Sequence, residues 1–486
     1  MNFRILAVAG VLAVSATGCD SLLDTNPKQS LTPDQALGSL PLYRNLLAGS
    51  YNRLQTEALY GQRLILAPEA LADNAIIANN TGRYTGELIN NRGTGVGGWA
   101  TWYAMINDVN FIIAGIDQLA NVDAATKSQI KGEAFFLRGL AYFNLARIYS
   151  YEPGVGSFDL GVVLRTTPTR VAADAAPKAR ATRAETYAQI LSDLNTARTE
   201  FQAAIAAGTD ATLGRNVYLG SLAGTEALLS RVHLYARDWA SAEALATAAL
   251  ASAPGQNRAG AAGRAGGAVL TTTANHVQAF TRQPNPESLF EVAISNNVTE
   301  GLGVNTAINS LTTVTASGFY SLRPSPELIA TYEATDVRRG FLVTTTAPTP
   351  GPYFNKFPGS LGNYADNIPV IRYAEVLLNR AEARAEQNKI GDALADLNTL
   401  RAARGATPSV AATQGALIAD ILLERRRELA FEGHRWFDIK RRGLDLVKPA
   451  ATAVGTIPSN DIRFLSQIPT DQVQLSGGVI AQNPGY

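Results

Sequence analysis

The chain has 486 residues, of which 46% are hydrophobic and 17% charged, so it is long enough for one large domain or two or three smaller ones. Its 42 basic and 41 acidic residues leave a net charge of +1, which excludes a global field that would attract nucleic acid. A single cysteine excludes an intramolecular disulfide and a cysteine zinc cluster, and the three histidines do not form a His-Glu-x-x-His motif.

The first residues predict a targeting segment. Arg4 precedes an almost wholly apolar run, Ile5–Val14, which is typical of a secretory signal and too short for an ordinary membrane-spanning helix. Ala16-Thr17-Gly18-Cys19 is similar to a lipobox, in which the cysteine thiol receives diacylglycerol. We therefore expect a lipoprotein signal peptide over residues 1–18 and lipidation of Cys19. The alternative is an ordinary signal peptide with a chance cysteine.

Helical patterns dominate the next part of the chain. Thr32-Pro33-Asp34-Gln35 and Thr182-Arg-Ala-Glu185 are capping boxes, which predict helix starts. Apolar residues recur at three and four positions in the segments between them. The predicted helices are Thr32 to about Leu54, Trp99–Leu119, Thr126–Tyr149 and Thr182 to about Ala206.

Residues 69–98 are polar, aromatic and glycine-rich without a period. Long irregular segments are uncommon in compact proteins unless they are functional, so we expect a surface loop that contributes to binding. Gly93-Thr-Gly95-Val-Gly97-Gly98 matches Gly-x-Gly-x-x-Gly, but a dinucleotide site needs a buried strand before the glycines, and Glu-Leu-Ile-Asn-Asn-Arg is a poor one. The glycines therefore indicate a flexible loop.

Two later segments each predict a pair of helices joined by a short turn. They resemble tetratricopeptide repeats, which stack on neighbours because one unit cannot bury its apolar face alone. The repeats are degenerate and interrupted, which favours a helical scaffold over a free solenoid. The predicted helices are Glu226–Ala236, Trp239–Leu250, Tyr373–Glu386 and Asp392–Ala403.

Between and after these pairs the helical period is lost. Residues 251–268 are rich in Ala, Gly and Arg, and a strand-like segment, Ser288–Ile294, and a short helix, Ser325–Tyr332, follow. We expect a mostly α protein with a helical scaffold at about 30–250 and 368–442. A loop-rich insert with short strands would occupy about 251–367, and residues 443–486 would form an irregular tail.

The densest charge pattern lies in Leu422–Arg442. Ile418, Leu422 and Leu429 share a helical face, Gly433 interrupts the run, and opposite charges three and four apart predict salt bridges along a helix that caps the fold. One sequence in this stretch closely resembles the signature of the SusD/RagB family. It reads Glu-Arg-Arg-Arg-Glu-Leu-Ala-Phe-Glu-Gly-His-Arg-Trp-Phe-Asp-Ile-Lys-Arg. The lipobox, residues 99–149, the rest of 371–442 and the ending Gln-Asn-Pro-Gly-Tyr resemble the same family.

This resemblance implies that residues 19–486 form a single SusD-like domain with four tetratricopeptide-like units. It implies an outer-membrane lipoprotein facing the cell exterior, with the membrane reached through the N-terminal lipid. The protein would bind an oligosaccharide or peptide and deliver it to a SusC-like TonB-dependent transporter without turnover. The helical units would contact the transporter, and the loops would contact the ligand.

No Gly-x-Ser-x-Gly elbow, P-loop or Cys/His pair occurs, so we predict no catalytic residue, cofactor or metal site, although a glycosidase carboxylate pair stays open. His434 and Asp438 fit a polar network beside Trp436 better than a pair of metal ligands. A surface-anchored glycan hydrolase and a tetratricopeptide-type envelope adaptor without a small ligand remain the alternatives.

The matching motifs belong to the scaffold, so the candidate ligand residues come from side-chain chemistry alone. Aromatic faces stack on sugars, and amides and charged groups hydrogen-bond to hydroxyls. Trp102 stands off the Trp99–Tyr103 pattern and is expected to be the less constrained of the two tryptophans. The candidates are Asp73, Asn74, Tyr84, Asn91, Arg92, Trp102, Phe319, Tyr320 and Arg323.

Overall fold

The computed structural model describes residues 38–208, 216–252, 269–295, 302–313, 318–345, 350–360, 362 and 364–486. The predicted signal peptide, Cys19, the helix start at Thr32 and most of the segment 251–268 lie outside the described residues.

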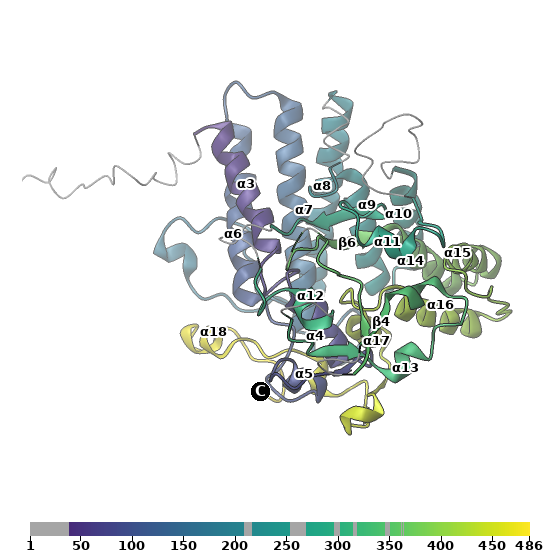
Figure 1. Ribbon diagram of the computed structural model, residues 1–486. Helices are drawn as coiled ribbons and strands as arrows, with labels where there is room; N and C mark the ends of the chain where they lie inside the picture. Colours follow the sequence, from purple (N-terminus) through teal and green to yellow (C-terminus); the bar gives the residue numbers. More distant parts are fainter. Residues whose placement is uncertain are drawn as a thin grey trace, which may run out of the picture.

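The long helices follow one another around an arc, from α3 and α6 through α7, α8, α9 and α10 to α14, α15 and α16 (Figure 1). Each helix in this series packs against its neighbour. Their bounds are α3 (Leu40–Leu54), α6 (Trp99–Gly115), α7 (Ala124–Tyr149), α8 (Arg183–Ala206), α9 (Leu222–Tyr235), α10 (Trp239–Ser252), α14 (Tyr373–Glu386), α15 (Ile390–Ala403) and α16 (Gln414–Glu428). The mostly α prediction is confirmed.

Local sequence signals explain several helix boundaries. The Thr182 hydroxyl accepts from the Glu185 amide at 3.1 Å, and the Glu185 carboxylate accepts from the Thr182 amide at 2.8 Å, which confirms the capping box of α8. The Asp123 carboxylate caps α7 by accepting from the Thr126 amide at 2.7 Å. The predicted helix Tyr373–Glu386 agrees with α14 at both ends.

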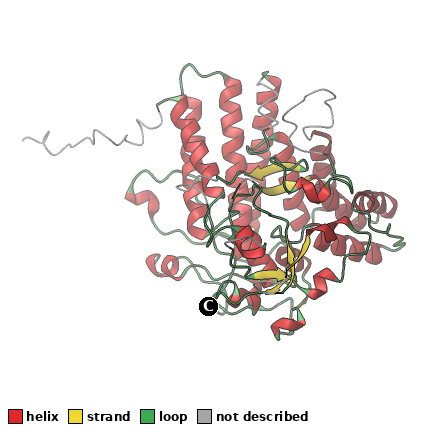
Figure 2. Cartoon of the chain, in the orientation of Figure 1, coloured by secondary structure: helices red, strands yellow, loops and turns green. Residues whose placement is uncertain are grey.

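Short elements fill the concave side of the arc and the lower part of the molecule (Figure 2). The predicted strand and the short helix of the insert are both present but shorter, as β2 and α13. The helices are α4 (Arg63–Leu71), α5 (Thr85–Leu88), α11 (His276–Ala279), α12 (Ile308–Thr312), α13 (Pro326–Ile329), α17 (Arg435–Arg442) and α18 (Thr470–Leu475). The strands are β1 (Ala75–Ile77), β2 (Ser288–Val292), β3 (Leu322–Pro324), β4 (Leu342–Thr345), β5 (Gly351–Phe354), β6 (Ile368–Arg372), β7 (Leu446–Val447) and β8 (Thr456–Ile457).

These strands form antiparallel pairs, β1–β3, β2–β6, β4–β5 and β7–β8. The first pair matters most for function, because it joins two segments about 250 residues apart in sequence. Ala75 lies opposite Pro324, Ile76 opposite Arg323 and Ile77 opposite Leu322. The loop after β1 and the chain before β3 are therefore held side by side.

The SusD/RagB-like signature forms α16, a turn and α17. Phe431 and Gly433 have φ of 61° and 78° in that turn, so both adopt left-handed backbone, and the predicted interruption at Gly433 is confirmed. The predicted apolar face is wrong by one residue. Leu417 and Ile421 are the fully buried apolar residues of α16, whereas Ile418 and Leu422 are half-buried.

Most charges of the signature are inside the protein, which corrects the expectation of a cap. The predicted salt bridges between charges three apart do form, from Arg427 to Glu424 at 3.3 Å and from Arg441 to Asp438 at 2.8 Å. Glu428 is buried and accepts from Arg372 at 2.6 Å, from Arg404 at 2.9 and 3.0 Å, and from Arg338 at 3.0 Å. Glu432 accepts from Arg372 at 2.7 Å and also pairs with Lys356. We call this set of residues the arginine–glutamate cluster; it ties α16 and the following turn to β6, α15 and the insert.

Burial alone would raise the pKa of Glu428, but the adjacent guanidinium groups of Arg404 and Arg372 outweigh this effect. They hold the pKa of Glu428 well below its usual range, so the carboxylate is ionised. The cluster is therefore a set of buried, paired charges.

Candidate ligand-binding site

The β1–β3 pair brings one group of polar and aromatic side chains together, which we call the Arg83–Phe319 surface. The guanidinium carbon of Arg83 lies 3.8 Å from the centre of the Phe319 ring, and Arg83 also donates to the Asn305 amide oxygen. The Asn79 amide donates to the Phe319 carbonyl at 3.1 Å. The hydroxyls of Thr81 and Ser321 are 2.6 Å apart.

This surface combines groups that suit a sugar. Arg83 and Phe319 are half-buried, and Asn80 beside them is exposed. Amides and a guanidinium offer donors and acceptors to hydroxyls, and an aromatic ring offers an apolar contact for C–H groups. The contacts among these residues hold the donors in place before a ligand arrives, which reduces the entropy lost on binding.

Strained backbone lies in the two segments that form this surface. Tyr84 and Tyr320 have φ of 58° and 49°, a region that bulky side chains rarely adopt. The amides of Phe319 and Tyr320 both donate to the Ser310 carbonyl, at 2.7 and 3.0 Å, so the segment 302–313 supports the strained turn. Strain of this kind is concentrated at functional sites, which favours this surface as a binding site.

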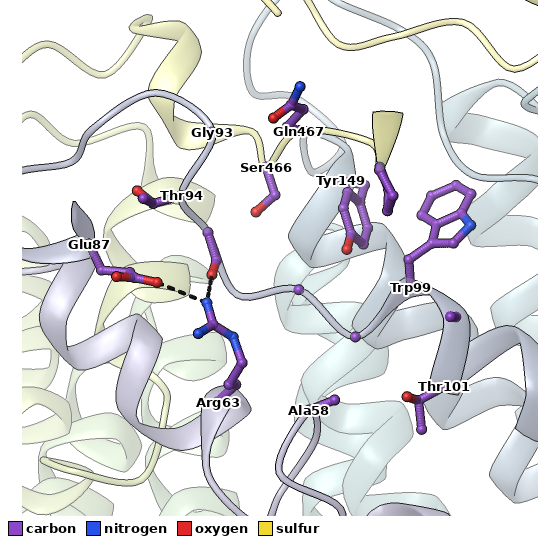
Figure 3. A pocket seen from close by; sticks show the side chains of 15 residues that line it. Ala58, Arg63, Glu87, Gly93, Thr94, Trp99, Thr101, Tyr149, Ser466 and Gln467 are labelled. Atoms are coloured by element: carbon purple, nitrogen blue, oxygen red, sulfur yellow. Dashed lines mark hydrogen bonds and ion pairs between the residues drawn. The ribbon is translucent and has the colours of Figure 1, made fainter. Parts of the chain in front are cut away.

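A cleft of about 510 Å³ lies between the glycine loop 93–98, the start of α6 and the tail (Figure 3). The Arg63 side chain pins the loop by donating to the carbonyls of Gly95 at 2.6 Å and Val96 at 3.2 Å, and to Glu87 at 2.8 Å. Trp99 and Tyr149 meet edge to face at 5.0 Å on the other side.

The glycine loop is not a dinucleotide site. The helix α5, rather than a buried strand, lies before the glycines, in agreement with the sequence argument. Gly98 has φ of 88°, and a Cβ there would lie 2.9 Å from Leu59, so this glycine serves a close chain approach at the start of α6.

A second hollow, of about 640 Å³, lies where the loop after α5 faces the tail. We call it the Asn91–Arg463 cleft. It contains two of the predicted ligand residues, Asn91 and Arg92, and both are exposed. The lining residues are Ile89, Asn90, Asn91, Arg92, Asn460, Asp461, Ile462 and Arg463.

Asp73 and Asn74 are buried and bound to the signature. Asp73 accepts from Arg435 at 2.7 and 2.9 Å, and the Asn74 amide oxygen accepts from Arg426 at 2.9 Å. Burial raises the pKa of Asp73, but the hydrogen bonds and charge of Arg435 outweigh it, and the pKa lies below its usual value. These two side chains therefore anchor β1 to α16 and α17.

Three predicted aromatic residues are also buried. Trp102 is completely buried against Tyr60, while Trp99 reaches the cleft wall, so the expectation that Trp102 is the less constrained tryptophan is wrong. The Tyr84 hydroxyl donates to Gln62 at 2.9 Å. The Tyr320 ring packs edge to face on Tyr353 at 6.1 Å between centres.

Phe319 and Arg323 are half-buried, and Arg323 donates to the Pro350 carbonyl at 2.9 Å. Apart from Arg323, the candidate set thus divides between the Arg83–Phe319 surface, the Asn91–Arg463 cleft and the interior. Sequence reasoning placed Arg83 and Asn79 in the right loop without selecting them. It gave no signal for Asn305, because that residue reaches the surface only through tertiary contact.

In the part of the chain that the structure describes, no group of three or more His, Cys, Asp or Glu side chains is arranged to hold a metal ion. Within the same residues, no helix is both long and apolar enough to cross a bilayer.

The mostly helical fold is that of the SusD superfamily. A SusD-like carbohydrate-binding protein from Bacteroides vulgatus superposes with a TM-score of 0.76 at 25% identity, over 91% of this chain and 98% of that one. A SusD superfamily protein from Bacteroides thetaiotaomicron superposes with a TM-score of 0.78 at 24% identity, over 93% and 100%.

Sequence comparison agrees. The model of the SusD family matches residues 342–486, and the model described as starch-binding associating with outer membrane matches residues 23–205. A SusD-like protein of Formosa agariphila is 25% identical over 91% of this chain and 90% of its own length. Another from the same organism is 24% identical over 98% of both chains. The chain belongs to the SusD/RagB family.

Proposed function

We propose that this protein is an outer-membrane lipoprotein, attached through Cys19 and facing the cell exterior, that captures an oligosaccharide for a SusC-like TonB-dependent transporter. Membership of the SusD/RagB family supports this role, and one of the two matching family models is described as starch-binding associating with outer membrane. The name of the Bacteroides vulgatus relative favours a carbohydrate over a peptide.

The observation that carries the proposal is the Arg83–Phe319 surface. It lies on loops held by a rigid scaffold, as binding sites commonly do, and its guanidinium, amides and ring are already positioned. Binding would require no turnover, so we expect capture and release rather than hydrolysis.

Calorimetric titration of the mature chain with neutral oligosaccharides, laminarin and starch oligomers among them, tests the site. Arg83→Ala and Phe319→Ala should each lower the affinity for the glycan by about tenfold or more, because each removes one well-placed contact. Val171→Ala, at an exposed apolar residue outside the surface, should leave affinity unchanged. Equal affinity in all four proteins would reject this surface as the site.

Membrane attachment and the partner are tested separately. Cys19→Ala should move the protein from the outer-membrane fraction to a soluble fraction, because the acyl chains supply the anchoring free energy. Gentle solubilisation and capture of the lipoprotein should bring down a large β-barrel partner. Capture without a barrel, in a preparation that keeps other membrane complexes intact, would favour the adaptor alternative.

The hydrolase alternative predicts shortened products when the purified protein is incubated with the glycan it binds. Intact glycan after prolonged incubation, recovered by chromatography, would support a binding role.

A further inference from the structure

We propose that the Asn91–Arg463 cleft is a second binding site, which takes the anionic group of an acidic saccharide. The cleft joins two segments that are distant in sequence, residues 89–92 after α5 and residues 460–463 of the tail. It is separate in its residues from the Arg83–Phe319 surface. The inference depends on the proposed function only in that its ligand is a saccharide.

Charge balance in the cleft provides the first argument. Asp461 accepts from the Arg463 guanidinium at 2.9 and 2.7 Å and from the Arg463 amide at 2.9 Å, so its carboxylate is already occupied. Arg92 is exposed, and among the described residues it has no hydrogen bond or ion pair. The charge of Arg92 also helps to lower the pKa of Asp461, so the cleft contains two guanidinium groups around one carboxylate and keeps an excess of positive charge.

The chemistry of Arg92 selects the ligand group. A guanidinium presents a planar fork of donors that matches a carboxylate or a sulfate, often with two parallel hydrogen bonds. Asn91 and Asn460 are exposed as well and add amide groups to the lining of the cleft. Carboxylate and sulfate share this recognition chemistry.

Asn90 provides an independent argument for a hydroxyl-bearing ligand. Its side chain is only 2% exposed and lines the cleft, and its Nδ2 donates to the Leu71 carbonyl at 2.9 Å. Its Oδ1 has no hydrogen-bond partner among the described residues. This oxygen is closed off from solvent, and buried acceptors are nearly always paired, so a sugar hydroxyl that displaced the cleft wall locally would supply the missing donor.

Two apolar side chains complete the match to a sugar ring. Ile89 is 50% exposed, and Ile462 of the tail segment lines the same cleft. The C–H faces of a pyranose can pack on such groups while its hydroxyls and acid group meet Asn90, Asn91 and Arg92. The volume of about 640 Å³ is within the usual range of small-ligand sites.

The test uses calorimetric titration of the full mature chain with three probes of similar length. These are an oligogalacturonate, a sulfated carrageenan oligosaccharide and a neutral starch oligomer. Arg92→Gln should lower the affinity for at least one acidic probe by about ten- to a hundredfold and leave the affinity for the neutral probe unchanged. Arg92→Lys should restore part of the affinity, because it keeps the charge and loses the fork.

Arg44→Gln is the matched control, because Arg44 is an exposed arginine on α3 outside the cleft and its loss changes the net charge equally. It should leave all three affinities unchanged. Raising the salt concentration from 50 to 500 mM should lower the affinity of the wild type for the acidic probe more than it lowers that of Arg92→Gln. The acidic probe that responds to Arg92 identifies carboxylate or sulfate as the recognised group.

The outcomes separate this inference from the proposed function. Acidic probes that bind no tighter than the neutral one, or whose affinity is the same in Arg92→Gln, overturn the second site while neutral binding at the Arg83–Phe319 surface stands. If binding of an acidic probe depends on Arg92, the cleft is supported. If binding of the neutral probe is then unchanged in Arg83→Ala and Phe319→Ala, the Arg83–Phe319 surface is rejected. A wild type that binds none of the three probes overturns both.

Discussion

Arginines are prominent in two regions of this protein, and they are buried and paired in one but at least partly exposed in the other. In the arginine–glutamate cluster, Arg338, Arg372 and Arg404 are at most 1% exposed, and each donates to carboxylates. At the two candidate binding sites, Arg83 is half-buried against a phenyl ring and Arg92 is exposed.

The difference lies in the cost of leaving each group unpaired. A charge inside a protein loses its hydration. The buried guanidinium groups of the cluster are therefore surrounded by carboxylates, and removing one partner leaves the other buried and unpaired. A charge at the surface keeps its hydration and can exchange water for a ligand. The family signature is therefore structural in this protein, and binding is expected where arginines are incompletely paired.

The largest expected effect comes from breaking the arginine–glutamate cluster. Arg372→Met would leave Glu428 and Glu432 short of a donor in a buried site, which we expect to cost about 3–5 kcal/mol of unfolding free energy. Urea unfolding followed by circular dichroism measures it. Arg44→Met at the surface should change stability by less than about 0.5 kcal/mol. A loss below about 1 kcal/mol for Arg372→Met would contradict this description of the cluster.

A smaller loss is expected from the turn between α16 and α17. Gly433 has φ of 78°, and a Cβ there would lie 2.3 Å from the Leu64 carbonyl oxygen, so Gly433→Ala should cost about 2–3 kcal/mol. Gly443 also has positive φ, 63°, but its Cβ would meet nothing within 4 Å, so Gly443→Ala should cost only about 1 kcal/mol. Equal losses in thermal unfolding would show that the close approach to Leu64 does not matter.

Buried carboxyls without a cation should behave oppositely to those in ion pairs. Burial raises the pKa of Glu133 to about 7, although Gln129 and Tyr51 donate to it at 2.9 Å. Its folded pKa lies above the unfolded value of about 4.5, so its stabilising contribution is complete below pH 4.5 and is lost as pH rises through 7. Glu375 is buried too, but Arg231 outweighs that burial and lowers its pKa to about 2. Its contribution is present above pH 4.5 and is lost as pH falls towards 2.

Between pH 5 and 8, the wild type should therefore lose about 1–3 kcal/mol more unfolding free energy than Glu133→Gln. Below pH 5, the pH dependence of stability should be the same in both proteins. Denaturant unfolding at pH 3, 5, 6.5 and 8 compares the two proteins. The same alkaline slope in both would show that Glu133 does not titrate in this range.

The smallest stability effect should come from Arg83. Arg83→Ala removes a partly exposed ring contact and one hydrogen bond, which are worth less than about 1 kcal/mol to folding. Its ligand affinity should fall far more than its stability, the reverse of Arg372→Met. Urea unfolding and titration on the same preparation make the comparison, and a large loss of stability in Arg83→Ala would assign Arg83 a structural role.

Local signals in the sequence determined where most helices lie. The capping box at Thr182 and the periodicity of Tyr373–Glu386 act within a few residues, so they can be recognised without the rest of the chain. The family signature was equally recognisable, because its residue order is local information. The irregular character of residues 69–98 indicated a surface loop, which is confirmed only in part, because β1 and α5 lie within the segment and many of its residues are buried.

Only the tertiary structure decided which charges are buried and which meet solvent. The partners of Glu428 come from Arg338, Arg372 and Arg404, which are 90, 56 and 24 residues away, and no helical spacing reports such pairs. Asp73 and Arg92 looked alike as candidate ligand residues until the fold paired one with Arg435 and left the other exposed. Periodicity describes one helix at a time, whereas burial depends on what packs against it. The same residue types can therefore form a core or a binding surface.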